Sequence, residues 1–466
     1  MNAPKKLLSL TSITALILLQ SGCAIGPTYQ RPPVAISDHF KEAPGWIAAA
    51  PADALAREQW WKLFGDPTLD TLTERVSVSN QNVAAALAAY AQARALAGQQ
   101  RAALFPAVSI TSAAKQANSQ ASSQNVQFSL GSTWEPDVWG RLQRSVTNAT
   151  ASAQASAGDL ATATLSAQGE LVSNYLLLRQ TDAQRRLLSA TIIDYQRVLQ
   201  ITENRYNAGV APKTDVLQAR TQLANAQSEE AGLQRQRAQL EHAIAVLLGE
   251  TPATFSLTQA DWKSAAPEVP LMIPSELLQR RPDIAAAERR MAAANELIGI
   301  ARSAYYPTIS LGASTGASAS GVSSLFSNPS SLWSIGVSLT QSVFNAGLVR
   351  NRVAGAEAAY EETVARYRQT VLSAFQGVED QLIAARVLAE QENLLIAASQ
   401  AADQAEQQVL NRYRAGQLGF LDVVLAQTTA LNARRALVLT QSNRQIASLG
   451  LIQALGGGWQ VAAASN

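Results

Sequence analysis

Hydrophobic and polar residues alternate with a period of two along four short segments of the chain. From Val126 to Trp134 the even positions are mainly apolar, and the odd positions carry Gln, Ser, Gly and Thr. From Trp333 to Leu339 apolar positions alternate in the same way with Ser and Gly. This period predicts four strands, at about 107–114, 125–135, 308–316 and 332–341.

A helical pattern follows each pair of strands and is unusually long. Residues 144–207 contain no proline, and at about 1.5 Å per residue they would reach roughly 95 Å, far beyond any bilayer. Four of their apolar residues follow the 4-3-4 spacing of coiled-coil seams: Leu188, Ile192, Tyr195 and Leu199. Charged side chains along these segments exclude burial in lipid. We therefore expect two antiparallel helical hairpins outside the membrane, at 144–248 and 348–455.

The chain also repeats itself. Residues 204–209 (NRYNAG) recur 207 residues later as 411–416 (NRYRAG). A second match joins Phe105-Pro106 and Tyr306-Pro307, each just before a predicted strand. Two matches in the same order favour duplication over chance. The expected plan is two structural repeats, each made of a short helix, two strands and a long helical hairpin.

The four strands have the pattern of an outer-membrane barrel. Such barrels use strands of about ten residues, with alternate apolar positions and aromatic residues near the strand ends, as at Phe105, Trp139 and Trp333. A soluble sheet with one face on a core is the alternative for the strands alone. Four strands cannot close a barrel, and an open edge in lipid would leave backbone groups unsatisfied. The barrel is therefore shared. Two copies would give eight strands and a filled interior, three would give twelve and a lumen, and the residues alone do not choose.

The first residues have the pattern of an export signal. Lys5 and Lys6 precede an uncharged apolar stretch from Leu7 to Leu19, and small residues lead to Cys23. Thirteen apolar residues are too few to span a bilayer. The segment ending at Cys23 resembles a bacterial lipobox, which implies that this cysteine is lipidated and becomes the mature N-terminus. An ordinary cleaved signal followed by a chance cysteine is the alternative. Several acyl chains would anchor the protein firmly.

Composition and charge exclude most catalytic classes. The 466 residues are 47% hydrophobic but only 6% aromatic and 15% charged, with a net charge of +2. Without a leader that contains two lysines the chain is formally neutral, which argues against nucleic acid as a partner. Two histidines and one cysteine cannot build a His-based metal cluster, a Cys-His dyad or a disulfide within one chain. We expect no metal or cofactor and no enzymatic activity; a lipid-anchored hydrolase would need a nucleophile beside His39 or His242, and no serine motif stands there.

Several motifs together resemble one known family. They are Gly22–Pro32 (GCAIGPTYQRP), Trp60–Leu69 (WWKLFGDPTL), Arg280–Ile284 (RRPDI) with Glu288, and the two Arg-Tyr-x-x-Gly turns. The chain resembles the outer-membrane efflux proteins, which are the channel components of tripartite drug-efflux pumps, in their lipoprotein branch. Ala24 in place of aspartate after the cysteine favours, by the same resemblance, export to the outer membrane.

The resemblance implies an architecture and a function. The fold would be mainly α with a membrane β-barrel part: a homotrimer whose twelve strands form one barrel, continuous with a tunnel of twelve helices through the periplasm. The channel would be passive and would open when a periplasmic adaptor and an inner-membrane pump of the RND type engage it. An export duct for proteins or metals, and a structural lipoprotein that braces the outer membrane, are the competing functions.

The expected organisation has six parts. They are a signal peptide (1–22), a lipidated N-terminal and equatorial segment (23–65), repeat 1 (66–248), an equatorial linker (249–281), repeat 2 (282–455) and a C-terminal tail (456–466).

Two groups of residues would carry the mechanism at the tip of the hairpins. The turns after the long helices resemble the adaptor-docking surface of the family, with Arg205, Tyr206, Gly209, Arg412, Tyr413 and Gly416. The glycines would cap the helices as well as take part in this surface. For the arginines and tyrosines, the alternative is that they lie on exposed helix ends without a role in tip contacts. By the same resemblance Asp422 faces the closed pore, where three like charges would select cations; N-capping of the returning helix is the alternative. The family often has a second aspartate and an arginine where this chain has Leu425 and Leu418, so packing of Leu418, Leu421 and Leu425 is expected to contribute to the gate.

Overall fold

The computed structural model describes residues 25–33, 40–42, 57–117, 123–269, 281–327 and 329–457. The predicted leader, Cys23 and His39 lie outside the described residues. The chain divides into two compact units. The first, here the strand unit, comprises Met1–Val34, Ala88–Gly158 and Ala286–Thr370; the second, the tip unit, comprises Ala35–Leu87, Asp159–Ala285 and Val371–Asn466.

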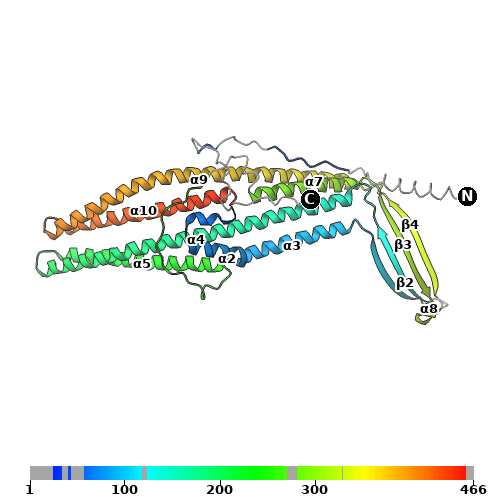
Figure 1. Cartoon of the computed structure of the whole chain (residues 1–466), viewed down its shortest axis with the longest axis horizontal. Helices are drawn as coiled ribbons and strands as arrows, with labels where there is room; N and C mark the ends of the chain where they lie inside the picture. Colours follow the sequence, from blue (N-terminus) through cyan, green and yellow to red (C-terminus); the bar gives the residue numbers. More distant parts are fainter. Residues whose placement is uncertain are drawn as a thin grey trace. The chain divides into compact units, whose positions relative to one another are not determined.

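The order of helices and strands shows the expected duplication (Figure 1). A 3-10 helix η1 (Arg57–Phe64) and α2 (Pro67–Ser79) come first. The first repeat then runs α3 (Gln81–Ala102), β1 (Ala107–Ala117), β2 (Ser123–Trp134), α4 (Arg141–Asn207) and α5 (Lys213–Leu247). The second runs α7 (Pro282–Ser303), β3 (Thr308–Ala319), α8 (Val322–Ser327), β4 (Ser330–Thr340), α9 (Leu348–Arg414) and α10 (Phe420–Ala454). The long helices α4 and α9 have 67 residues each, and α5 and α10 have 35 each.

The strand unit contains one antiparallel sheet in the order β1-β2-β3-β4. Its register places Ile110 opposite Leu130, Leu130 opposite Thr315, and Thr315 opposite Trp333. Residues that face one another across strands share a face of the sheet. The strands β1 and β3 run further than the alternation predicts, because their polar ends still pair in the ladder. The polar segment expected between β3 and β4 contains the short helix α8.

Glycines end both long helices. Gly209 has a φ of +76°, its N–H donates to the Tyr206 carbonyl at 2.9 Å, and the Val210 N–H donates to the Arg205 carbonyl at 2.9 Å. Gly416 has a φ of +75° and the same pair of bonds. This is the Schellman pattern, in which a residue with positive φ closes a helix C-terminus. Both glycines therefore have the capping role. Along the described parts of the chain, no helix combines the length and the apolar character needed to cross a membrane.

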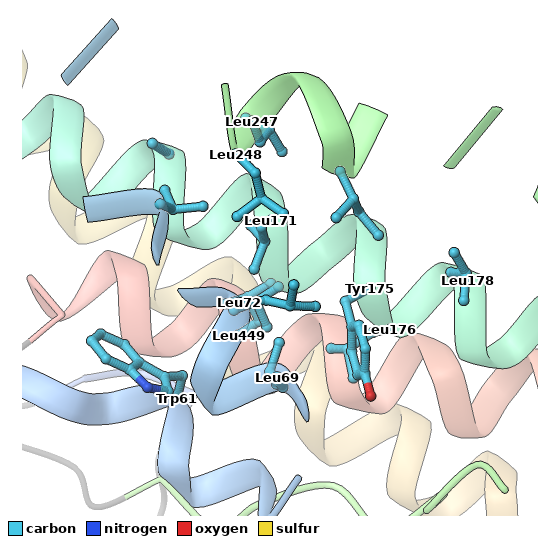
Figure 2. Close-up of a cluster of buried hydrophobic side chains, with 14 of the residues drawn as sticks. Trp61, Leu69, Leu72, Leu171, Tyr175, Leu176, Leu178, Leu247, Leu248 and Leu449 are labelled. Atoms are coloured by element: carbon cyan, nitrogen blue, oxygen red, sulfur yellow. The ribbon is translucent and has the colours of Figure 1, made fainter. Parts of the chain in front are cut away.

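Large apolar side chains form the core of the tip unit. Figure 2 shows Trp61, Leu69, Leu72, Leu171 and Tyr175 gathered with leucines of α5 and α10. The Asp66 carboxylate caps α2 by accepting from the Thr68 N–H at 2.9 Å, and it also accepts from the Tyr175 hydroxyl at 2.5 Å. Burial, and then this hydrogen bond, raise the pKa of Tyr175 to about 12. The motif around Trp60 therefore joins η1 and α2 to the long helices.

A buried ionic network lies beside this core. Asp182 is almost fully buried, and its carboxylate accepts from Arg237 Nε at 2.8 Å and pairs with Arg179 Nη1 at 3.3 Å. Arg179 also donates to the Thr258 carbonyl at 2.8 Å. A buried carboxylate is tolerated only when it is paired in this way. The network holds the segment after α5 against α4.

The N-terminal segment is tied to helices within the strand unit. The Tyr29 hydroxyl donates to Glu288 Oε1 at 2.6 Å, and Arg31 donates to the hydroxyl of the buried Tyr367 at 2.9 Å. Burial and the bond to Glu288 raise the pKa of Tyr29. The segment that contains Tyr29 and Arg31 is thus held in place by specific contacts.

Candidate functional site

The sheet presents one apolar face. Its register brings the large exposed hydrophobic residues of three strands to the same side: Val108, Ile110, Phe128, Leu130, Trp134, Trp333, Ile335, Val337 and Leu339. Within the strand unit, no described residue buries this face. Contiguous apolar surface on this scale marks a contact with membrane or with another protein.

The opposite face of the sheet is small and polar. The Thr111 and Ser129 hydroxyls are hydrogen-bonded at 2.8 Å, and so are those of Ser314 and Ser334. Gly131 and Gly336 lie on this side as well. The sheet therefore has one apolar and one polar face, which is the arrangement that the alternation predicts.

Aromatic residues lie where the sheet meets the helices. The Trp139 ring stacks on Tyr306 with centroids 4.9 Å apart, and its Nε1–H donates to the Pro307 carbonyl at 2.7 Å. Trp134 donates from Nε1 to the Leu104 carbonyl at 3.0 Å. Rings with an apolar body and a hydrogen-bonded edge are typical of a membrane interface.

At the other end of the long helices, Tyr413 joins the two hairpins. Its side chain is only 2% exposed. The Arg205 guanidinium lies 4.6 Å from its ring centroid, and Arg205 Nη1 donates to its backbone carbonyl at 2.7 Å. The hydroxyls of Tyr413 and Thr202 are 3.2 Å apart, and Phe420 packs on the ring with centroids at 5.9 Å. Of the residues predicted at the tip, Arg205 and Tyr413 contact each other, and the Tyr413 side chain is buried.

Tyr206 and Arg412, the repeat counterparts of Tyr413 and Arg205, are on the surface. Tyr206, the repeat counterpart of Tyr413, is 42% exposed. Neither Tyr206 nor Arg412 makes a side-chain hydrogen bond or ion pair with a described residue. Thr202 and Phe420 complete the buried cluster and were missed at the sequence level. A phenylalanine directly after the second glycine turn was the available signal for Phe420.

The predicted gate residues lie in the first turns of α10 and just before it. Leu421 and Leu425 are 60% and 59% exposed, one turn apart, and Asp422 is exposed between them. Gly419 is the N-cap of α10, and no side chain caps this helix. The N-capping alternative for Asp422 is therefore wrong: this carboxylate stands in the first turn, where it complements the helix dipole.

The first hairpin differs at the matching positions. Where the second hairpin has Leu418, Leu421 and Leu425, the first has Ala211, Thr214 and Gln218. Two exposed leucines one turn apart therefore lie at the start of α10, whereas the first turns of α5 have one exposed leucine, Leu217. Exposed leucines one turn apart are positioned to meet copies of themselves or an apolar partner.

Comparison with known proteins decides the family. The family model for outer membrane efflux proteins matches residues 72–250 and 273–457. The chain belongs to this family. It is 32% identical to the pyoverdine export outer membrane protein OpmQ of Pseudomonas aeruginosa, over 96% of this chain and 97% of OpmQ. It is 34% identical to the probable efflux pump outer membrane protein TtgC of Pseudomonas putida, over 98% of this chain and 96% of TtgC.

A solved structure agrees with the sequence matches. The outer-membrane channel OprN superposes with a TM-score of 0.87 at 31% identity, over 94% of this chain and 100% of that chain. The family inferred from the Trp-Trp and Arg-Pro-Asp motifs is therefore confirmed, and so are the outer-membrane location and the role in efflux. The family's proteins are channels.

Proposed function

We propose that this chain is the outer-membrane exit channel of a tripartite efflux system. It would conduct drugs or other small molecules passively from a periplasmic adaptor and an inner-membrane pump of the RND type to the outside. The observation that supports this most directly is the sheet with one apolar and one polar face, in a chain of the efflux family. The names of two relatives also support it: OpmQ is a pyoverdine export outer membrane protein, and TtgC is a probable efflux pump outer membrane protein.

The proposed assembly is a homotrimer. A sheet of four strands has two open edges, which lipid does not tolerate. Three copies would supply twelve strands around a lumen and twelve helices around a periplasmic tunnel. Lipidation of Cys23 is proposed as the anchor in the outer membrane, and the contacts of Tyr29 and Arg31 would hold the lipidated end against the helices. No nucleic acid takes part.

The tip residues are assigned two different roles in this proposal. The glycine turns at Gly209 and Gly416, together with the exposed Tyr206 and Arg412, form the surface offered to an adaptor. Arg205 and Tyr413 hold the two hairpins together beneath that surface. Leu418, Leu421, Leu425 and Asp422 form the constriction.

Single-channel conductance in a planar bilayer tests the proposal. We expect low conductance from the wild type, because the constriction is closed without partners. Leu421→Ala and Leu425→Ala should raise it several-fold by removing apolar closure, and Asp422→Ala should reduce the preference for cations. Leu217→Ala is the matched control, since Leu217 is an exposed leucine in the first turns of α5. Folded trimers that conduct in none of these variants would refute the channel and favour a bracing lipoprotein.

A further inference from the structure

The four strands and the segments that join them are almost free of charge. Residues 103–134 and 303–349 contain one charged side chain, that of Lys115 near the end of β1. The nearest carboxylate along the chain, Glu135, follows the helical end of β2 and pairs with Arg141. A charge with no opposite charge near it dominates the local electrostatic potential. The position of Lys115 on the sheet therefore decides which environment becomes positive.

The register places Lys115 on the polar face. Its cross-strand partner is Asn125. Two steps of two residues back along β1 is Thr111, whose hydroxyl is hydrogen-bonded to that of Ser129 at 2.8 Å. Side chains two residues apart in a strand share a face, so Lys115 and Thr111 lie on the polar side and Ile110 on the other. The Lys115 side chain is exposed there.

Lys115 also lies at the end of the sheet that is far from the helices. β1 begins at Ala107, just after α3, and Lys115 is its ninth residue. A tilted barrel strand crosses the membrane in about 9–11 residues. Figure 1 shows the strands running from the helices to α8 at their far end. In the proposed channel, whose helices are periplasmic, Lys115 is therefore at the outer mouth.

The second repeat has no such charge, and its packing leaves no room for one. By the alignment of Phe105 with Tyr306, the counterpart of Lys115 is Gly316. Gly316 lies opposite Ser129 on the same polar face. A Cβ added at Gly316 would lie 2.8 Å from the Ser129 Cα, which is closer than van der Waals contact allows. Each chain therefore supplies one cationic side chain to this face.

These observations assign a role in selectivity to one residue. Resting on the proposed channel assembly, we infer that Lys115 determines the ion selectivity of the outer mouth. Three copies would place three ammonium groups around the lumen, and rings of Lys or Arg select anions. The ring would attract anionic permeants toward the exit and repel cations that enter from outside. Asp422, of opposite charge, stands at the other end of the same path.

The width of the lumen decides how strongly this ring acts. Twelve strands about 4.8 Å apart, tilted by about 40°, give a backbone radius of roughly 12 Å. The four-carbon stem of lysine brings each ammonium group closer to the axis than the backbone is. The ammonium groups then lie within about one Debye length of a permeating ion at about 0.1 M salt (about 10 Å), but well beyond it at about 1 M salt (about 3 Å). The selectivity should therefore weaken as salt increases.

Reversal potentials in planar bilayers test this inference. The full-length trimer is measured under a KCl gradient, in the wild-type background and with Leu421→Ala. Lys115→Gln should raise the ratio of K⁺ to Cl⁻ permeability about threefold at about 0.1 M KCl, and Lys115→Glu should raise it about tenfold. Both differences should largely disappear at about 1 M KCl, because the charges are then screened.

Two relocations of the charge on the Lys115→Gln chain are the matched controls. Ala113→Lys places a lysine on the same polar face and should restore the wild-type permeability ratio. Ala114→Lys places it on the opposite face and should not restore the ratio. Both positions are exposed, and both relocated chains keep the net charge of the wild type.

The outcomes separate this inference from the channel proposal. Equal permeability ratios for wild type, Lys115→Gln and Lys115→Glu in conducting trimers would overturn the inference and leave the channel intact; a lysine that only contacts lipid phosphate would give this result. Restoration by Ala114→Lys as complete as that by Ala113→Lys would also overturn it, because the face of the sheet would then have no effect. Trimers that conduct in none of the variants would overturn both.

Discussion

Replacing Tyr413 by alanine should loosen the tip of the hairpins without unfolding the protein. The ring is buried between Arg205, Thr202 and Phe420, so its removal leaves a cavity and a guanidinium without its aromatic face. Truncation of a buried aromatic residue costs about 3–5 kcal/mol. Since about 1.4 kcal/mol is a factor of ten, the local opening constant of the tip should rise by about two orders of magnitude or more.

Hydrogen exchange of the backbone amides measures this opening. In Tyr413→Ala, amides in the last turns of α4 and α9 should exchange about a hundredfold faster, and those of the core around Leu171 should be unchanged. Tyr413→Phe should cost only about 0.5–1 kcal/mol, because the Thr202 hydroxyl keeps its 2.9 Å bond to the Val198 carbonyl. Val210→Ala, at an exposed position of the turn, is the control and should change little. Equal effects of Tyr413→Phe and Tyr413→Ala, or no faster exchange in either, would refute the role given to the buried ring.

Three further predictions concern stability. Gly416→Ala should lower the free energy of unfolding, measured by thermal denaturation, by about 1–2 kcal/mol, because φ is positive there. The control is Gly232→Ala within α5, where an added Cβ meets nothing; it should be neutral or stabilise the protein by up to about 1 kcal/mol. Asp182→Asn should destabilise by about 3 kcal/mol in denaturant titrations, because the buried Arg179 loses its carboxylate partner and Arg237 loses one of its two; a loss below about 1 kcal/mol would contradict the network. Since the folded pKa of Tyr175 is raised, its contribution to stability is complete below pH 10 and is lost as pH rises from about 10 to about 12. Tyr175→Phe should remove that part of the alkaline loss, and identical pH profiles for the two proteins would contradict the shift.

The elements of the chain follow from local patterns. A period of two over ten residues predicts a strand, and a proline-free run of more than sixty residues predicts a long helix; few other structures fit either pattern. Glycine ends both long helices because it accepts positive φ without strain. The duplication is visible in the sequence because replacing the glycine of the turn motif would destabilise both copies alike, since both glycines have positive φ. Helix α8 was missed because six residues are too short for a periodic signal.

The tip shows what local patterns leave open. Tyr206 and Tyr413 stand in the same motif, yet one is exposed and the other is buried. The difference arises because α4 of the same chain, with Thr202 and Arg205, covers only the second tyrosine. Burial at such a position depends on neighbours distant in sequence, and the ion network around Asp182 was missed for the same reason.

The two repeats share the features that their packing requires and differ where the proposed constriction lies. Where the repeats must pack alike, they agree: the glycine turns, the helix lengths of 67 and 35 residues and the order of strands are the same in both. Where the proposed constriction lies they disagree, because α10 begins with exposed leucines and α5 with threonine and glutamine at the matching positions. A ring of three copies would then alternate polar and apolar tips. Closure would need only the three apolar ones, and the polar hairpins between them would be free to keep their place when the channel opens.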